Sequence, residues 1–414
     1  MILRTEMIRP LNWLLAGLLL AAAAGPNVSQ AQAPALPATT GFNPDLQKKA
    51  DMGDPAAEFQ LSVIYRKGLG VKPDEVLAAS WLRKAADAGI PVAQYNLGLC
   101  YELGQGVTKD DEQAAAWYEK AAEQDQTDAL KALAKIYAAG RGVHQDMSQA
   151  FALWKRAGAL GDADAQYEVA VWLSHGWGTK KDLSESAVWL QKAADQNDPR
   201  AERDLGAQYE YGTGVPQDYG HAAQLYRKAA EQGYSPAEFS LGLCYVHGKG
   251  VEQDLKQALE WYGKAADQNN PNALVNMALL YINGNGVKKN EKQGWELLFR
   301  AAEAGAPDAQ LQIGMDFEDG VHGRKKDPKQ AEEWLRKAAQ QGSVPAQFNL
   351  AMLLSSKPDE VYYWLGLVLP HIKEESLAKT NQIRDAAAAL LTPDQRGEID
   401  EHIKQWQADH ANSD

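Results

Sequence analysis

The strongest constraint on this chain is an internal repeat of about 36 residues, seen most plainly at residues 236–266. An alanine opens each copy, with a large apolar residue four positions later and a small residue directly after that. These alanines are Ala57, Ala93, Ala129, Ala165, Ala201, Ala237, Ala273, Ala309 and Ala346. Self-similarity at a period of about 20 to 50 residues indicates a stack of equivalent supersecondary units, so the repeat decides the fold class.

Each copy is predicted to form two helices joined by a glycine turn. Ala237 and Leu241 lie four residues apart, on one apolar stripe of a first helix. Gly248 and Gly250 follow, and glycine readily takes the left-handed conformation that caps a helix C-terminus. Asp254 is the expected N-cap of the second helix. One such hairpin cannot bury its own apolar faces, so it must stack against its neighbours.

The pattern A-x-x-x-L-G-x-x-Y-x-x-G-x-G-V-x-x-D-x-x-x-A-x-x-W-Y-x-K-A-A resembles the Sel-one-like repeat, a relative of the tetratricopeptide repeat. The resemblance covers roughly residues 46–354. It implies an all-α fold, a right-handed superhelical solenoid of about nine 36-residue helix-turn-helix repeats. It also implies a scaffold for protein–protein contacts, of a kind often found in bacterial envelopes or the eukaryotic secretory pathway.

The ends of the chain are predicted to serve export and capping. Residues 1–31 are typical of a secretory signal peptide, with a short apolar core and a small-x-small cleavage site ending at Ala31. An uncleaved anchor is the alternative. Residues 32–44 are predicted to be a flexible linker, residues 45–354 the repeat array, and residues 355–414 a degenerate repeat with capping helices. We therefore expect an exported protein, periplasmic or secreted, with no membrane span after signal cleavage.

The sequence offers little site chemistry. The net charge of −13 argues against a nucleic-acid partner, which needs clustered Lys and Arg. Cys100 and Cys244 are expected to be buried packing residues, with a mixed disulfide as the alternative. Ser376 and Lys379 form an S-x-x-K without the companion motifs of a serine β-lactamase. The eight histidines show no metal-binding spacing, so no metal or cofactor is predicted.

Two first-helix columns are the candidate binding groove. They lie two and six residues after the anchor alanine, roughly opposite the apolar stripe. The candidates are Phe59, Tyr95, Lys131, Lys135, Tyr167, Arg203, Ala207, Phe239 and Phe348. Packing between successive repeats is one interpretation, and a groove for a protein or peptide partner is the other. In the related tetratricopeptide repeat this face lines a concave peptide groove. Lys131 and Arg203 interrupt the apolar column, so we expect their repeats to carry specificity.

The eighth copy has one extra residue and a basic loop at 321–327. A solvated turn is one interpretation, and a contact for an acidic partner is the other. For the whole chain, the leading hypothesis is a non-enzymatic scaffold that binds an envelope protein or peptide. The alternatives are a penicillin-interacting, β-lactamase-like hydrolase, which the family resemblance implies only for members with a cysteine pair in every repeat, and an adaptor in polysaccharide export or cell-wall maintenance.

Overall fold

The computed structural model describes residues 41–410, which contain twenty-one α-helices, one short 3-10 helix and no strand. The predicted signal peptide and most of the predicted linker lie outside the described residues. Contacts divide the chain into two compact units. Within the described range, one unit comprises residues 41–237 with 249–252, and the other comprises residues 238–248 with 253–410.

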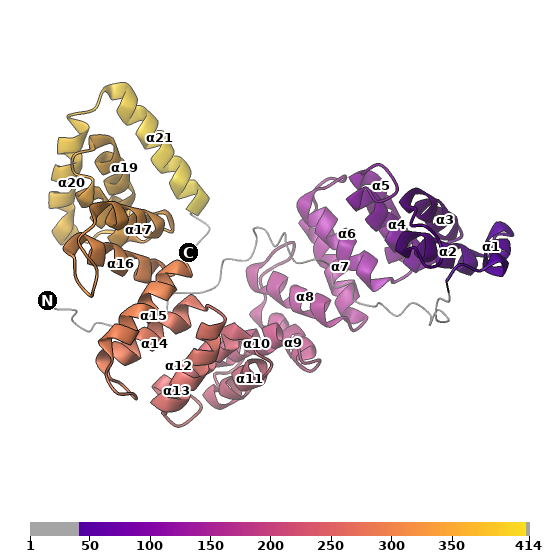
Figure 1. Cartoon of the computed structure of the whole chain (residues 1–414), viewed down its shortest axis with the longest axis horizontal. Helices are drawn as coiled ribbons and strands as arrows, with labels where there is room; N and C mark the ends of the chain where they lie inside the picture. Colours follow the sequence, from indigo (N-terminus) through magenta and orange to yellow (C-terminus); the bar gives the residue numbers. More distant parts are fainter. Residues whose placement is uncertain (1–40, 411–414) are drawn as a thin grey trace. The chain divides into compact units, whose positions relative to one another are not determined.

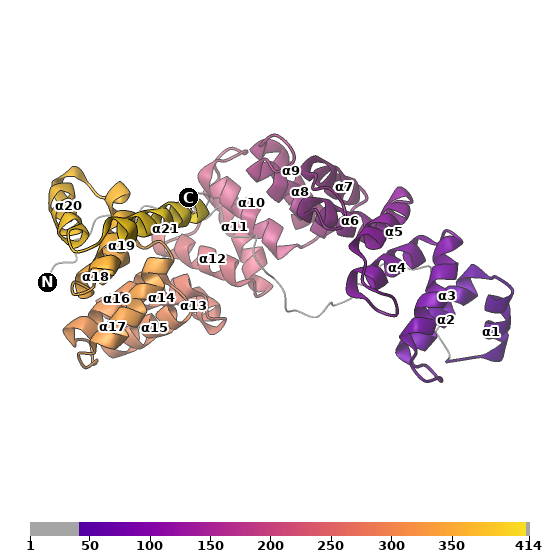
Figure 2. The ribbon, with the colours of Figure 1, turned by 90° about the horizontal axis from the view of Figure 1, so that it is seen from above.

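The predicted helix pairs form in every repeat (Figure 1). After α1 (Pro44–Asp51), the first helices of successive repeats are α2 (Pro55–Lys67), α4 (Pro91–Leu103), α6 (Thr127–Ala139), α8 (Ala163–His175), α10 (Pro199–Tyr211), α12 (Ser235–His247), α14 (Pro271–Asn283), α16 (Pro307–Asp319) and α18 (Val344–Leu353). The second helices are α3 (Glu75–Asp87), α5 (Asp111–Glu123), α7 (Met147–Ala159), α9 (Leu183–Ala194), α11 (Tyr219–Glu231), α13 (Leu255–Asp267), α15 (Glu291–Glu303), α17 (Pro328–Gln340) and α19 (Pro358–Val368). Figure 2 shows from above that partners such as α2 and α3, or α14 and α15, lie side by side.

The turns and caps follow the predicted chemistry. The first glycine of each turn, from Gly68 to Gly320, adopts a left-handed φ between 66° and 77°. Asp254 accepts hydrogen bonds from the backbone N–H groups of Lys256 and Gln257, so it is the N-cap that the sequence predicts. The second glycine has a further role, because a Cβ at Gly106 would collide with the backbone carbonyl of Glu75. That turn therefore packs directly on the start of the preceding repeat's second helix.

The small residue after the large apolar position makes room for a side chain of the second helix, which is a tyrosine at Gly98, Gly206 and Gly242 and a leucine at Gly314. A Cβ at Gly98 would lie 2.6 Å from the ring of Tyr118, and one at Gly206 would lie 2.8 Å from the ring of Tyr226. Both tyrosines are almost fully buried. In these repeats the close approach expected from the small-residue column is therefore that of a tyrosine on the second helix of the same repeat.

One buried column is polar. The residue after the anchor alanine is Glu or Gln in seven repeats and is only 1% to 6% exposed: Glu58, Gln94, Gln166, Glu202, Glu238, Gln310 and Gln347. Gln94 donates to the carbonyl of Ala86 in the preceding repeat at 3.2 Å and accepts from Gln124 at 2.8 Å. Because each buried polar group needs such partners, this column joins consecutive repeats by hydrogen bonds.

A helical cap follows the array. The ninth hairpin lacks a glycine turn, and η1 (Leu369–His371), α20 (Glu374–Ala388) and α21 (Pro393–His410) come after it. The last helix begins at Pro393 as predicted, and Thr392 and Gln395 form a reciprocal capping box. Ile403 on α21 is 7% exposed and packs in the cluster that contains Leu365.

Candidate functional site

The nine groove candidates all lie on first helices, but their environments differ. Phe59 is buried, Lys135 is exposed, and the others are half-buried. Residues from Phe59 to Ala207 belong to the unit of residues 41–237, whereas Phe239 and Phe348 belong to the other unit. The nine candidates are therefore divided between the two compact units.

The aromatic candidates take part in packing inside their own repeats. The ring centroids of Tyr95 and Tyr118 are 5.6 Å apart, and those of Phe239 and Tyr262 are 5.8 Å apart. Burial, helped by the charges of Asp128 and Glu102, raises the pKa of Tyr95 to about 12. These rings contact the second helix on one side and keep an exposed edge, so packing accounts for much of this column.

Lys131 is held by acids from its own repeat and the next. Its Nζ lies 3.0 Å from Asp162, 3.6 Å from Asp128 and 3.8 Å from Asp164, and its side chain is 17% exposed. Burial favours the neutral amine, but the Asp162 hydrogen bond and the nearby carboxylates outweigh it and raise the pKa of Lys131. The lysine therefore stays charged and links α6 to the start of α8.

Arg200 continues this arrangement into the next repeat. Its Nη2 lies 3.0 Å from Asp164 and 2.7 Å from Asp198, and its guanidinium lies 4.4 Å from the centroid of the Tyr167 ring. Burial opposes its charge, but the two aspartates raise the pKa of Arg200 above its ordinary value. A cation stacked on an aromatic ring and paired with acids is held in one orientation.

Arg203 and Tyr167 share one carboxylate. Arg203 Nη1 lies 2.6 Å from Asp204, and the Tyr167 hydroxyl donates to the same group at 3.0 Å. Burial is the main cause that raises the pKa of Tyr234, and the Asp204 charge adds to it. Among the described residues, the buried Nε of Arg203 has no hydrogen-bond partner.

These side chains form a continuous surface along α6, α8, α10 and the turn before α12, which we call the polar strip. Its members are Asp128, Lys131, Asp162, Asp164, Tyr167, Arg200, Arg203, Asp204 and Tyr234. Sequence reasoning found three of them and missed the four acids, Arg200 and Tyr234. For three of the missed residues the sequence did contain a signal. Asp128, Asp164 and Arg200 precede the groove column by three residues and so lie on the same helix face.

The residues that the sequence suggested for catalysis or thiol chemistry do not belong to the polar strip. Ser376 and Lys379 are exposed on α20, and no described residue supplies the companion motifs beside them. Cys100 and Cys244 are buried thiols, and burial raises the pKa of Cys100. Residues 41–410 contain no group of three or more His, Cys, Asp or Glu side chains placed to hold a metal ion. No helix in the described range is long and apolar enough to cross a membrane.

Comparison with known protein families shows the family to which the chain belongs. The Sel1 repeat model matches eight consecutive segments: residues 55–90, 91–126, 127–162, 163–198, 199–234, 235–270, 271–305 and 307–343. The chain belongs to the Sel1 repeat family. Sel1 repeat proteins are generally protein-interaction scaffolds, and the family is generally non-catalytic. The helix pair α18–α19 follows the eighth matched repeat, close to the nine repeats predicted.

Two solved structures show the same solenoid architecture. A Sel1 repeat protein from Oxalobacter formigenes is 30% identical, with a TM-score of 0.64, over 73% of this chain and 88% of that one. A protective antigen of uropathogenic Escherichia coli with an SLR fold is 25% identical, with a TM-score of 0.63, over 88% of this chain and 94% of that one. A search of curated proteins finds no match.

Proposed function

We propose that this Sel1 repeat protein is an exported, non-enzymatic scaffold that binds a protein or peptide partner of the cell envelope through the polar strip. The observation that carries the proposal is the strip itself. Side chains of successive first helices place lysine, arginine, aspartate and tyrosine on one continuous surface. Other repeats have packed aromatic or aliphatic side chains in the same columns, so the strip distinguishes these repeats from the rest of the array.

The strip suits specific recognition. Its charges are ordered by mutual ion pairs, and Asp164 and Arg200 remain 43% and 35% exposed. Pre-ordered charges cost little further entropy when a partner binds, and they discriminate between partners by complementarity. Half-buried Tyr167 and Tyr234 add the apolar contact area that protein interfaces favour.

Binding is tested by cross-linked capture from envelope extract. The protein lacking residues 1–31 serves as bait, beside a Lys131→Gln/Arg200→Gln variant with an unchanged helical spectrum. We expect one recurrent partner whose affinity for the variant falls by about tenfold or more. The matched control is Lys180→Gln/Lys181→Gln, which removes two exposed charges from the turn after α8 and should retain the partner. Capture of no specific protein, or equal capture by the strip variant, would contradict the proposal.

Export is tested separately. The apolar segment at 11–24 and the cleavage site after Ala31 support it. Cell fractionation should place the protein outside the cytoplasm, with a mature chain that begins at Gln32 by mass spectrometry. A full-length cytoplasmic protein would contradict this part of the proposal. Nitrocefin turnover abolished by Ser376→Ala would favour the hydrolase alternative, and specific binding on a glycan array would favour the polysaccharide adaptor.

A further inference from the structure

The turn after α16 differs from the other turns of the array. His322 occupies the column of the second glycine and adopts a left-handed φ of 52°. Its Nδ1 lies 2.9 Å from the fully buried carboxylate of Asp316, and Arg324 Nη1 lies 3.3 Å from the same group. His322 is solvent-exposed, with 37% of its side chain accessible, whereas Arg324 is only 13% exposed and is held against the buried Asp316.

Two lysines of the same loop have no such acidic partner among the described residues. Lys325 and Lys326 are exposed, and neither forms an ion pair with any described residue. Because Arg324 is occupied by Asp316 and lies near the rings of Phe299 and Phe317, it cannot also serve a ligand at the surface. The loop thus presents two exposed ammonium groups beside the anchored Arg324.

The neighbouring turn adds more cations to the same region. His322 stacks on Trp295 of α15 with ring centroids 3.6 Å apart, so this loop lies over the first turns of α15. Lys288 and Lys289 directly precede α15 and are exposed, and Lys289 pairs with Glu291 at 2.6 Å. We call Lys288, Lys289, Lys292, Lys325 and Lys326 the basic turn surface.

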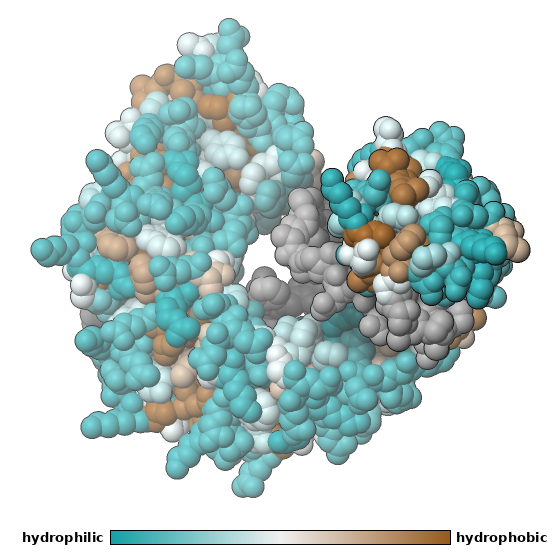
Figure 3. Space-filling view, turned by 45° about the vertical axis from the view of Figure 1, so that its right-hand side comes forward, coloured by the Kyte–Doolittle hydropathy of each residue, from teal (hydrophilic) through white to brown (hydrophobic). Residues whose placement is uncertain are grey.

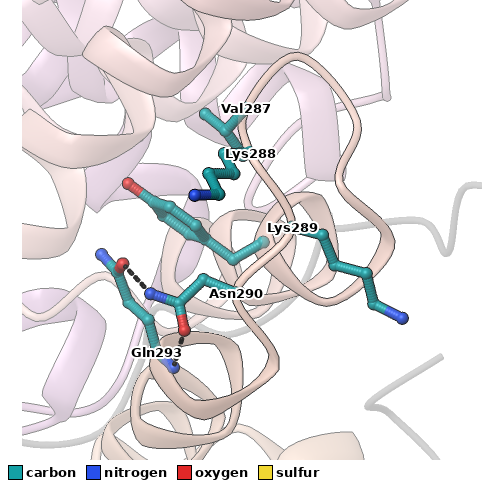
Figure 4. Close-up of a pocket in the computed structure, with 6 residues that line it drawn as sticks. Val287, Lys288, Lys289, Asn290 and Gln293 are labelled. Carbon is teal, nitrogen blue, oxygen red and sulfur yellow. Dashed lines mark hydrogen bonds between the residues drawn. The ribbon is translucent and has the colours of Figure 1, made fainter.

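A hollow of about 460 Å³ opens beside these lysines. It is lined by Tyr281, Val287, Lys288, Lys289, Asn290 and Gln293. Figure 4 shows that Asn290 and Gln293 face each other, with two hydrogen bonds of 3.1 and 3.2 Å between them. Lys288 and Lys289 leave the turn in different directions (Figure 4). The hollow therefore combines an ammonium group, amide groups and an apolar wall in one place.

We propose that the basic turn surface binds an acidic peptide segment, rich in Asp or Glu, of a second protein. Charge complementarity argues for this occupant, since two consecutive turns and the start of α15 carry five exposed lysines, and among the described residues only Glu291 and Glu296 form ion pairs with them. The whole chain carries a net charge of −13, which disfavours long polyanions such as nucleic acids or anionic membranes. A short acidic segment meets only the local field, because charges are screened beyond about 10 Å at 0.1 M salt.

This surface is a second ligand site, separate from the polar strip and in the other compact unit. It goes beyond the proposed function, and the proposal for either site can be disproved without affecting the other.

The test is fluorescence anisotropy with the intact protein and a labelled peptide of alternating Glu and Ser residues. We expect saturable binding that weakens as salt rises, and no binding of the matching Gln and Ser peptide. Lys288→Glu/Lys289→Glu and Lys325→Glu/Lys326→Glu should each weaken binding by about tenfold or more. The matched control is Lys180→Glu/Lys181→Glu, because that lysine pair occupies the same two columns as Lys288 and Lys289.

The control variant distinguishes binding at a specific site from nonspecific attraction of the peptide to any pair of lysines. The turns before and after Lys180 and Lys181 carry His144-Gln145 and Pro216-Gln217, so that pair has no second pair of lysines beside it. Equal loss in all three variants would overturn the proposal, as would equal binding of the neutral peptide. Binding to phosphatidylserine vesicles without binding to the peptide would overturn it in favour of a membrane surface. Loss of peptide binding in a Lys131→Gln/Arg200→Gln variant would instead assign the peptide to the polar strip.

Discussion

Glycines illustrate how single residues set the packing of each repeat. Gly242 and Gly263 both lie inside helices of the same hairpin, yet their surroundings differ. A Cβ at Gly242 would lie 2.5 Å from the ring of Tyr262, whereas one at Gly263 would meet nothing within 4 Å. The same Gly→Ala substitution is therefore expected to have opposite effects on stability at these two positions.

We expect Gly242→Ala to destabilise the protein by about 1–3 kcal/mol, because the buried tyrosine has no space into which to move. Gly263→Ala should stabilise it by about 0.5–1 kcal/mol, since alanine loses less backbone entropy in a helix. Urea unfolding followed by circular dichroism measures both. Two substitutions of the same sign would contradict the packing described here.

The buried glutamates predict a pH effect. Burial raises the pKa of Glu202 despite the charge of Lys228 and a hydrogen bond from Gln232. Stability from such a group is fully present below the unfolded pKa of about 4.3 and is lost as pH rises through the higher folded value. Glu202→Gln should therefore raise the melting temperature at pH 7, by up to about 4 °C, and leave it nearly unchanged at pH 4.

The chain itself supplies the precedent for this substitution, because Gln94, Gln166 and Gln310 occupy the same column. Glu231→Gln is the matched control, since Glu231 is exposed on the same hairpin and should show no such pH dependence. An equal gain at both pH values would show that burial of the charge is not the cause.

At the scale of the element, the second helices are stabilised by the same devices in almost every copy. An aspartate or asparagine caps each start from α3 to α17, and lysines lie over tryptophan rings one turn earlier. Lys264, for example, has its Nζ 3.6 Å from the centroid of the Trp261 ring. The W-x-x-K spacing of the repeat thus has a physical basis, a cation over the outer face of a buried indole.

The N-caps give a graded prediction. Asp254→Ala should destabilise the protein by about 1 kcal/mol, because two backbone N–H groups of α13 lose their acceptor. Asp254→Asn should cost much less, as Asn290 already caps α15 in this way. Thermal unfolding of both variants, beside Lys256→Ala as an exposed control, measures the difference. Equal losses for Ala and Asn would argue against capping.

Most of the helices could be predicted from sequence, because their caps and stripes are local and repeat at a fixed interval. The glycine turns, Asp254 and Pro393 required no knowledge of distant residues. The polar strip was only partly predictable, since Lys131 pairs with Asp162, 31 residues away at the N-cap of α8, and with Asp164 on α8. The contacts of His322 were not predicted, because they are made with the buried carboxylate of Asp316 and with Trp295 on the neighbouring α15.

At the scale of the whole molecule, both described ends of the array are covered. Phe42 donates its backbone N–H to the carbonyl of Leu69 at 2.8 Å, and its ring packs on Tyr65. It thus covers the first glycine turn, whereas later turns pack on a preceding repeat. α20 and α21 cover the other end. The face drawn in Figure 3 is mostly hydrophilic, with apolar residues in separate patches. A solenoid needs such terminal covers because its last repeats lack a neighbour.

Removal of α21 should therefore expose apolar surface. A chain that ends at Leu391 loses the packing of Ile403 and of the half-buried Ile399 and Trp406. Each buried apolar side chain contributes about 1.5–3 kcal/mol, so we expect a destabilisation of several kcal/mol and self-association. Size-exclusion chromatography and thermal unfolding measure both, with a chain ending at His410 as the control. Unchanged stability would show that α21 is not a cap.

The buried polar column also bears on how such an array can grow. Gln94 pairs with Gln124, Gln166 with Gln196, and Glu202 with Gln232. In the third repeat the two corresponding positions are both leucine, Leu130 and Leu160. Both members of each pair belong to one repeat, and the links to the preceding repeat use backbone carbonyls that any copy provides. A 36-residue repeat can therefore be duplicated or deleted without leaving a member of this column unpaired. Copy number can change while the hydrogen bonds that this column makes between copies are kept.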